Sequence, residues 1–221
     1  MLRLLVTLIL ITNICYGTAT NNVKYLVGIM VDFPIEIPDD PLTSGTGKFL
    51  LQDDVSFLDE NSGDRCTGFL VDSPPHDRNY FASQLSAVQN YYNNISNNLV
   101  SFDTHLIDSI FTVQKNMSYY ATGDTLLGEF FSESVILAKD KIEKWLKTTQ
   151  VCIGEVLFVV FHAGLGQDFS VPFLDPTSHD LKSAYVDEAI LLGNEIPEIY
   201  CNITGESYKV KRGIILPETQ N

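Results

Sequence analysis

Positive charge is scarce in this 221-residue sequence, where 14 lysines and arginines face 28 aspartates and glutamates and the formal net charge is −14. Such an acidic chain has no basic face for phosphates, which excludes nucleic acid as a partner and argues against binding to an anionic membrane surface. Four cysteines are too few for a small scaffold built from disulfides. What remains is a globular domain, because 45% hydrophobic residues can supply a core.

The short signatures of common catalytic sites are missing as well. The sequence contains no Gly-x-Ser-x-Gly elbow, no His-Glu-x-x-His and no Cys-x-x-Cys. Gly164 and Gly166 are not followed by the third glycine and the helix that a dinucleotide-binding loop requires, because Phe169 takes the third position and Pro172 follows. We therefore expect neither a nucleotide cofactor nor a zinc site formed by residues 1–221 alone.

Residues 1–17 have the layout of an export signal. Arg3 supplies the positive charge, residues 4–14 are almost all apolar, and small residues around Gly17 suit a cleavage site. An uncleaved anchor is the alternative, but the apolar run is shorter than a membrane-spanning helix. We predict a signal peptide over residues 1–17 and a single α/β domain over residues 18–221, secreted or periplasmic and without membrane contact after cleavage.

Cleavage after Gly17 would leave three cysteines, which are Cys66, Cys152 and Cys201. Export makes disulfides possible, and an odd number leaves at least one thiol unpaired. A bridge between Cys152 and Cys201 is one possible pairing, and the sequence alone does not select it.

Hydrophobic periodicity predicts five strands. Residues 23–33 and 156–161 are continuous apolar runs, which are typical of buried central strands. Alternating patterns predict half-buried strands over residues 99–107 and 110–114. A last strand is expected over residues 208–216.

Two amphipathic helices are predicted between these strands. The first begins after an N-cap at Asp77 or Asn79, and the second, stronger one covers residues 129–146. Their apolar stripes are Phe81, Leu85, Val88, Tyr92 and Ile95 in the first, and Phe131, Val135, Ala138, Ile142 and Trp145 in the second. The order of elements predicts an α/β fold with a mixed, partly parallel sheet and two main helices, with a long Pro- and Gly-rich loop over residues 34–65.

Few residues stand out as candidates for chemistry. His162 ends a predicted central strand and Asp168 follows in the next loop, and sites in α/β sheets gather at the carboxyl ends of strands. Both are candidate cleft residues for a hydrolase, although a histidine that is only hydrogen-bonded at a strand end is the more common arrangement for a residue such as His162. Residues 59–64 (DENSGD) resemble a calcium loop in composition but lack its closing glutamate, so weak calcium binding and a plain turn both remain open.

Four groups of residues form a distinctive set: 23–33 with the loop that follows, 74–81 (PPHDRNYF), 115–120 (KNMSYY), and 161–168 (FHAGLGQD) with 174–177 (LDPT) and 183–185 (SAY). Together they resemble the N-terminal part of secreted bacterial proteins related to the immune inhibitor A metallopeptidases. The resemblance implies a zincin-like fold, zinc as cofactor and a protein or peptide substrate.

In that family the helix with the zinc ligands would be expected after residues 214–219, and the sequence stops at Asn221. The expectation is therefore a zincin-like N-terminal subdomain, truncated before its active-site helix. Such a domain would be the scaffold of a zinc-metallopeptidase-like protein, without catalytic residues or cofactor of its own. Two alternatives remain: a non-enzymatic exported binding module, and another α/β hydrolase that uses His162.

Overall fold

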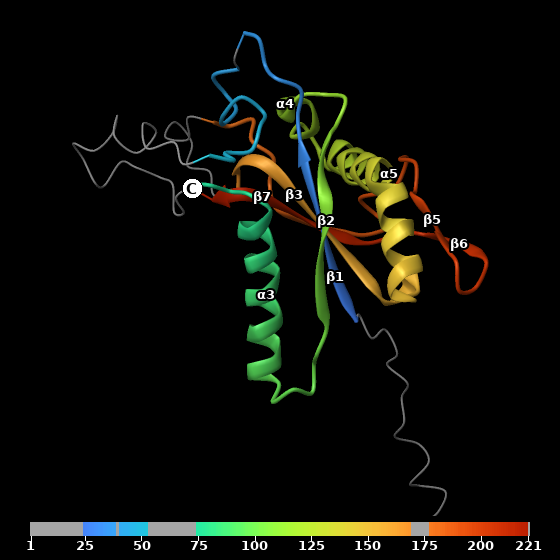
Figure 1. The fold of residues 1–221 in the computed structure, drawn as a ribbon. Helices are drawn as coiled ribbons and strands as arrows, with labels where there is room; N and C mark the ends of the chain where they lie inside the picture. Colours follow the sequence, from blue (N-terminus) through green and yellow to red (C-terminus); the bar gives the residue numbers. More distant parts are fainter. Residues whose placement is uncertain (1–23, 39, 53–73, 169–176, 221) are drawn as a thin grey trace, which may run out of the picture.

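The computed structural model describes residues 24–38, 40–52, 74–168 and 177–220, and Figure 1 shows their arrangement. The fold is α/β, with a mixed, mostly parallel five-stranded sheet in the order β2-β1-β3-β7-β4. These strands are β1 (Tyr25–Asp32), β2 (Asp103–Thr112), β3 (Val156–Gly166), β4 (Ala184–Val186) and β7 (Gly213–Gln220). Only β4, at one edge, runs antiparallel to its neighbour.

Three α-helices, a short 3₁₀ helix and a separate hairpin accompany this sheet among the described residues. They are α3 (Arg78–Ile95), α4 (Met117–Tyr120), α5 (Asp124–Thr149), η1 (Ile153–Glu155), and the pair β5 (Glu198–Cys201) and β6 (Glu206–Lys209). The long helices α3 and α5 lie on opposite faces of the sheet, and the hairpin lies beside α5 (Figure 1). The predicted mixed, partly parallel sheet with two main helices is thereby confirmed.

Helix α3 starts where the sequence predicts. The Asp77 side chain accepts hydrogen bonds from the backbone N–H groups of Asn79 at 2.8 Å and Tyr80 at 3.1 Å, which makes it the N-cap. The predicted stripe is only half used, because Phe81 and Leu85 are buried whereas the apolar residues from Val88 onward are exposed. The second half of α3 therefore extends past the sheet (Figure 1).

Helix α5 buries the stripe that its sequence predicts. Phe131, Val135, Ala138 and Ile142 are all fully buried against the sheet. Trp145, at the end of the stripe, is partly buried and stacks on His105 of β2 with ring centroids 5.0 Å apart. One face of the sheet is thus covered along the whole length of this helix.

Two predicted strand boundaries were wrong. The strands expected over residues 99–107 and 110–114 are one strand, β2, with an irregularity opposite the stretch from Gly28 to Met30 that hides the alternation. The strand expected over residues 208–216 is two elements, since residues 210–212 leave the β5–β6 hairpin before β7 joins the main sheet.

Several expectations fall on residues that the structure does not describe. These are the signal peptide over residues 1–17, the calcium-like loop over residues 59–64, and Cys66. Within the described ranges, none of the helices has the length and apolar character needed to cross a membrane.

Candidate functional site

A buried histidine–carboxylate pair lies at the carboxyl edge of the parallel strands. Glu218 comes from β7, and His76 comes from the segment just before α3. His76 Nδ1 lies 2.8 Å from Glu218 Oε1, and the two residues are 0% and 3% exposed. Two polar side chains that are distant in the sequence are therefore brought together and buried. They lie at the carboxyl ends of the strands, where α/β sheets commonly have their ligand-binding and active sites.

The carboxylate of Glu218 is held by two backbone donors as well as by the imidazole. The Leu50 N–H donates to Oε1 at 2.7 Å, and the Gly164 N–H donates to Oε2 at 2.9 Å. Burial raises the pKa of Glu218, although the hydrogen bonds from Gly164, Leu50 and His76 oppose that rise. The carboxylate therefore fastens the loop before α3 and the end of β3 to the last strand of the sheet.

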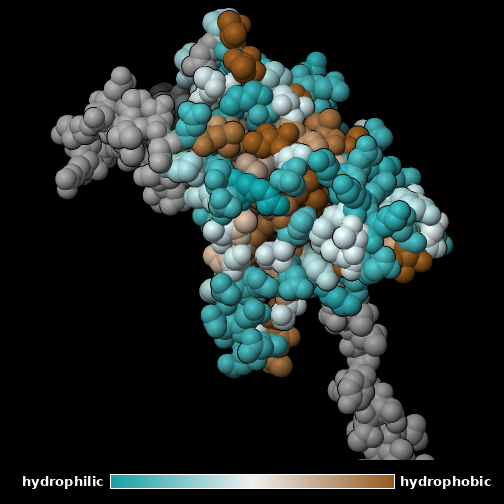
Figure 2. All heavy atoms as spheres, viewed as in Figure 1, coloured by the Kyte–Doolittle hydropathy of each residue, from teal (hydrophilic) through white to brown (hydrophobic). Residues whose placement is uncertain are grey.

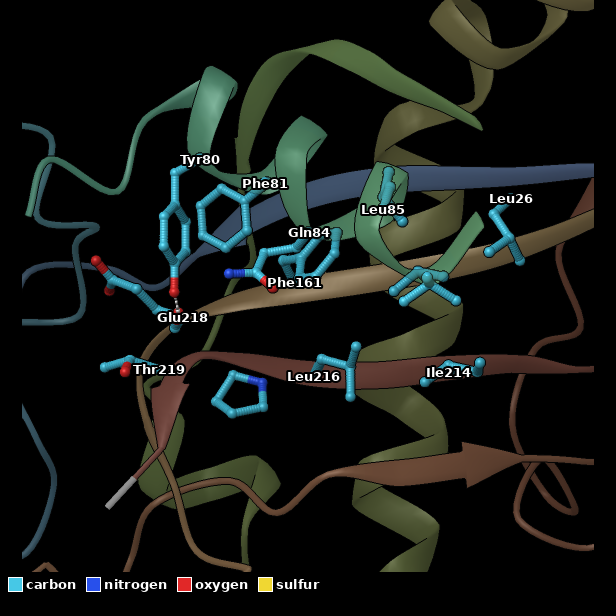
Figure 3. A pocket seen from close by; sticks show the side chains of 13 residues that line it. Leu26, Tyr80, Phe81, Gln84, Leu85, Phe161, Ile214, Leu216, Glu218 and Thr219 are labelled. Atoms are coloured by element: carbon cyan, nitrogen blue, oxygen red, sulfur yellow. Dashed lines mark hydrogen bonds between the residues drawn. The ribbon is translucent and has the colours of Figure 1, made fainter. Parts of the chain in front are cut away.

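Neighbouring groups fix the imidazole in the same place. The His76 backbone N–H donates to the Leu50 carbonyl at 2.7 Å. The Tyr80 ring lies against the imidazole with centroids 4.5 Å apart, and its hydroxyl donates to the Glu218 carbonyl at 3.4 Å, as Figure 3 shows. Because Tyr80 belongs to α3 and Glu218 belongs to β7, the hydrogen bond between them joins the helix to the sheet at this edge.

An apolar groove of about 420 Å³ runs from this pair along the α3 face of the sheet (Figure 3). Side chains of α3 form one wall, and side chains of the strands, chiefly β3 and β7, form its floor. The lining residues are Leu26, Tyr80, Phe81, Gln84, Leu85, Val88, Val159, Phe161, Ile214, Leu216, Pro217, Glu218 and Thr219. Polar groups are concentrated at the end of the groove nearest His76.

His162, which the sequence singles out, lies in the core on the opposite face. Its ring is fully buried beside Phe33 and Phe130, and Nδ1 lies 3.0 Å from the Ala163 carbonyl. Burial lowers the pKa of His162 to about 4, so the ring is neutral at pH 7 and donates from Nδ1. His162 is therefore the hydrogen-bonded histidine that the sequence left as the alternative, but it lies inside the strand, because β3 continues to Gly166 beyond its predicted end at residue 161.

Asp168, the second candidate, is hydrogen-bonded to the chain near β4. Its Oδ1 accepts a hydrogen bond from the Ser183 N–H at 2.7 Å, and Oδ2 accepts one from the Ser183 hydroxyl. The charge of Asp168 acts on His162 and opposes the effect of burial on its pKa, but the His162 ring is fully buried and does not open into a cleft, so the geometry gives no support to a hydrolase built on the two residues.

The described residues do not fit a zinc ion. No group of three or more histidine, cysteine, aspartate or glutamate side chains in the described ranges has metal-binding geometry. His76 Nε2 is buried without a hydrogen-bond partner there, but both oxygens of the adjacent Glu218 already accept hydrogen bonds. One nitrogen and one committed carboxylate cannot replace the three or four ligands that zinc requires.

Sequence reasoning missed His76 and Glu218. The rule that pointed to His162 applies equally to Glu218, which ends the apolar run of β7, so that residue could have been found. His76 carries no such signal, because only the folded chain brings residues 142 positions apart into contact.

Comparison of the chain with protein-family models, with curated proteins and with solved structures returned no match.

Proposed function

We propose that this domain is the scaffold portion of a secreted zinc-metallopeptidase-like protein that acts on proteins or peptides. In this proposal, residues 1–221 are inactive alone, and the apolar groove beside α3 seats the helix that carries the zinc ligands. The sequence resemblance to proteins related to immune inhibitor A suggests the family, and the groove is the observation that carries the proposal.

The two faces of the sheet differ in how well they are covered. On one face α5 packs along the sheet and fully buries its apolar stripe except for the partly buried Trp145. On the other face α3 packs on β1 and β2, and Ile214 and Leu216 of β7 are only partly buried in the open groove. An amphipathic helix laid beside α3 would bury these side chains and complete the second layer.

The position of the groove also fits the order of elements in the proposed family. The resemblance places the zinc helix directly after residues 214–219, and these residues form most of β7, the strand that floors the groove. A helix that follows β7 and turns back over the sheet would lie against Leu216 and Val88. The His76–Glu218 pair would then stand at its start and hold the edge of the sheet rigid.

A non-enzymatic exported binding module is the second candidate. A concave, mostly apolar surface with a few polar groups at one end is the usual composition of a ligand site. In that case an apolar peptide or small molecule, instead of a helix of the same protein, would fill the groove.

A side-by-side cleavage assay separates these proposals. Casein and gelatin are incubated with the 221-residue chain and with the longer chain translated from the same gene, each with and without a chelator. The scaffold proposal predicts cleavage by the longer chain only, abolished by chelator. Cleavage by the 221-residue chain that a chelator does not affect would refute it, and two inactive chains would favour the binding module.

A further inference from the structure

Two cysteines from distant parts of the chain meet beside the β5–β6 hairpin. Cys152 immediately precedes η1, and Cys201 is the last residue of β5. Both are free thiols in the structure, with their sulfur atoms 3.0 Å apart. Cys201 is fully buried, whereas Cys152 is only partly buried. The fold thus selects this pair, which the sequence left as one possibility among several.

The surroundings shift the pKa values of the two thiols in opposite directions. Burial alone would raise the pKa of Cys201, but hydrogen bonds from Cys152 and from the backbone of Thr204 and Ile203 outweigh it and lower the pKa to about 7. The hydrogen bond to Cys201 and burial raise the pKa of Cys152 to about 11. The surroundings therefore favour a thiolate at Cys201 over a thiolate at Cys152.

The hairpin itself is held to the rest of the domain by few polar contacts. The Tyr200 N–H donates to Glu143 of α5 at 2.9 Å, and Ile199 of β5 is fully buried. Strands β5 and β6 pair with each other and form no ladder with the main sheet. A covalent link at Cys201 would attach this two-stranded unit to the segment that enters the central strand β3.

We propose that Cys152 and Cys201 form an intramolecular disulfide that fastens the β5–β6 hairpin to the start of β3. The oxidant is a small-molecule disulfide such as oxidised glutathione, which the compartment implied by the predicted signal peptide would supply. The proposal is independent of the function of the groove.

The reaction is an ordinary double exchange. Cys152, the partly exposed thiol, loses its proton to solvent and attacks one sulfur of the oxidant, which forms a mixed disulfide and releases one glutathione thiolate. The thiolate of the buried Cys201 then attacks Cys152 Sγ, which forms the protein disulfide and releases a second glutathione thiolate. The two protein thiols are oxidised, and one molecule of oxidised glutathione is reduced to two thiols.

Peptide mapping of the exported full chain tests the proposal without any substitution. The protein is unfolded in guanidinium with a maleimide to cap free thiols, digested without reductant and analysed by mass spectrometry. The expected result is a linked peptide pair containing Cys152 and Cys201, with maleimide on Cys66. Maleimide on both Cys152 and Cys201, or a link from either of them to Cys66, would overturn the proposal.

Oxidation of the purified, reduced chain provides the control. With oxidised glutathione the wild-type chain should lose the mass of two hydrogen atoms without a lasting adduct on Cys152 or Cys201. The Cys201→Ser variant should instead keep glutathione on Cys152, because it has no second thiol nearby to release it. A stable glutathione adduct on Cys152 of the wild-type chain would contradict the proposed second step.

Discussion

Glu218 and His162 are buried ionisable side chains near the carboxyl ends of the parallel strands, and they lie on opposite faces of the sheet. Glu218 faces α3 and accepts hydrogen bonds from two backbone groups and from His76. His162 faces α5 and is surrounded by aromatic rings. Burial disfavours the charged form of both, so it raises the pKa of Glu218 and lowers that of His162 to about 4. Each residue makes a different prediction.

Replacement of Glu218 by glutamine should destabilise the domain. The amide NH₂ would face either the Leu50 or the Gly164 N–H, and a buried donor left without an acceptor costs about 1–3 kcal/mol. The matched control is Glu188→Gln, because Glu188 is exposed and forms a surface ion pair with Lys211, so its loss should change the free energy of unfolding by less than about 0.5 kcal/mol. Urea unfolding of both variants measures the difference, and equal stabilities would contradict the described role of Glu218.

His162 should make the domain sensitive to mild acid. Its folded pKa of about 4 lies below the unfolded value of about 6.5, so the unfolded state binds more protons between these two values. The stabilisation is fully present above pH 6.5 and is lost as the pH falls towards 4, which amounts to about 3 kcal/mol.

The His162→Phe variant should therefore lose much of the decline in stability between pH 6.5 and pH 4, because phenylalanine fits the apolar surroundings and does not titrate. The His179→Gln variant is the control, since the His179 side chain is 46% exposed. Denaturation at several pH values measures the slopes, and an unchanged acid slope in His162→Phe would show that another group causes the decline.

Helices and strands with a regular apolar pattern were predicted well from the sequence. The helical stripe of α5 and the continuous apolar run of β1 are each uninterrupted, so the local sequence alone indicates which kind of element forms and where it lies. The wrong strand boundaries fall where the alternation of apolar and polar residues is interrupted, as at the irregular register of β2 with β1. The hairpin was missed because β5 and β6 are only four residues each.

The contact between α5 and β7 depends on a glycine. A Cβ at Gly213 would lie 2.2 Å from Phe131 Cε2 and 3.0 Å from the Phe158 carbonyl oxygen, distances that require the helix or strand to shift. The Gly213→Ala variant should therefore lose about 1–3 kcal/mol of stability. Gly154→Ala is the control, because a Cβ there has nothing within 4 Å. Thermal unfolding of both proteins tests the packing, and equal melting temperatures would contradict it.

Apolar side chains around α3 are exposed on the surface of the molecule. Val88, Tyr91, Tyr92 and Ile95 are exposed on the second half of the helix, and Leu99 is exposed in the turn that follows. Figure 2 shows hydrophobic side chains at the lower tip of the molecule, where α3 ends and β2 begins. Uncovered apolar surface of this kind is typical of a site where another element or protein packs. Hydropathy along the sequence could not predict it, because the stripe of α3 is regular throughout.

The first residues of the chain make a prediction about its processing. If residues 1–17 are the export signal that the sequence predicts, protein from a secreting host begins at Thr18 or Thr20. N-terminal sequencing measures this directly, and an intact Met1 on a cytoplasmic product would contradict export.

The zinc content of four proteins after dialysis tests the proposed role of the groove most directly. They are the 221-residue chain, the longer chain from the same gene, and the longer chain with either Val88→Glu or Leu137→Glu. Val88 lines the groove and Leu137 lies on α5, and the two are matched at 41% and 40% exposed.

The scaffold proposal predicts far less than one zinc per 221-residue chain and one zinc per longer chain. It also predicts that Val88→Glu lowers zinc retention, because a charge in the groove disfavours the seated helix, and that Leu137→Glu does not. Stoichiometric zinc on the 221-residue chain, or none on the longer chain, would contradict the proposal.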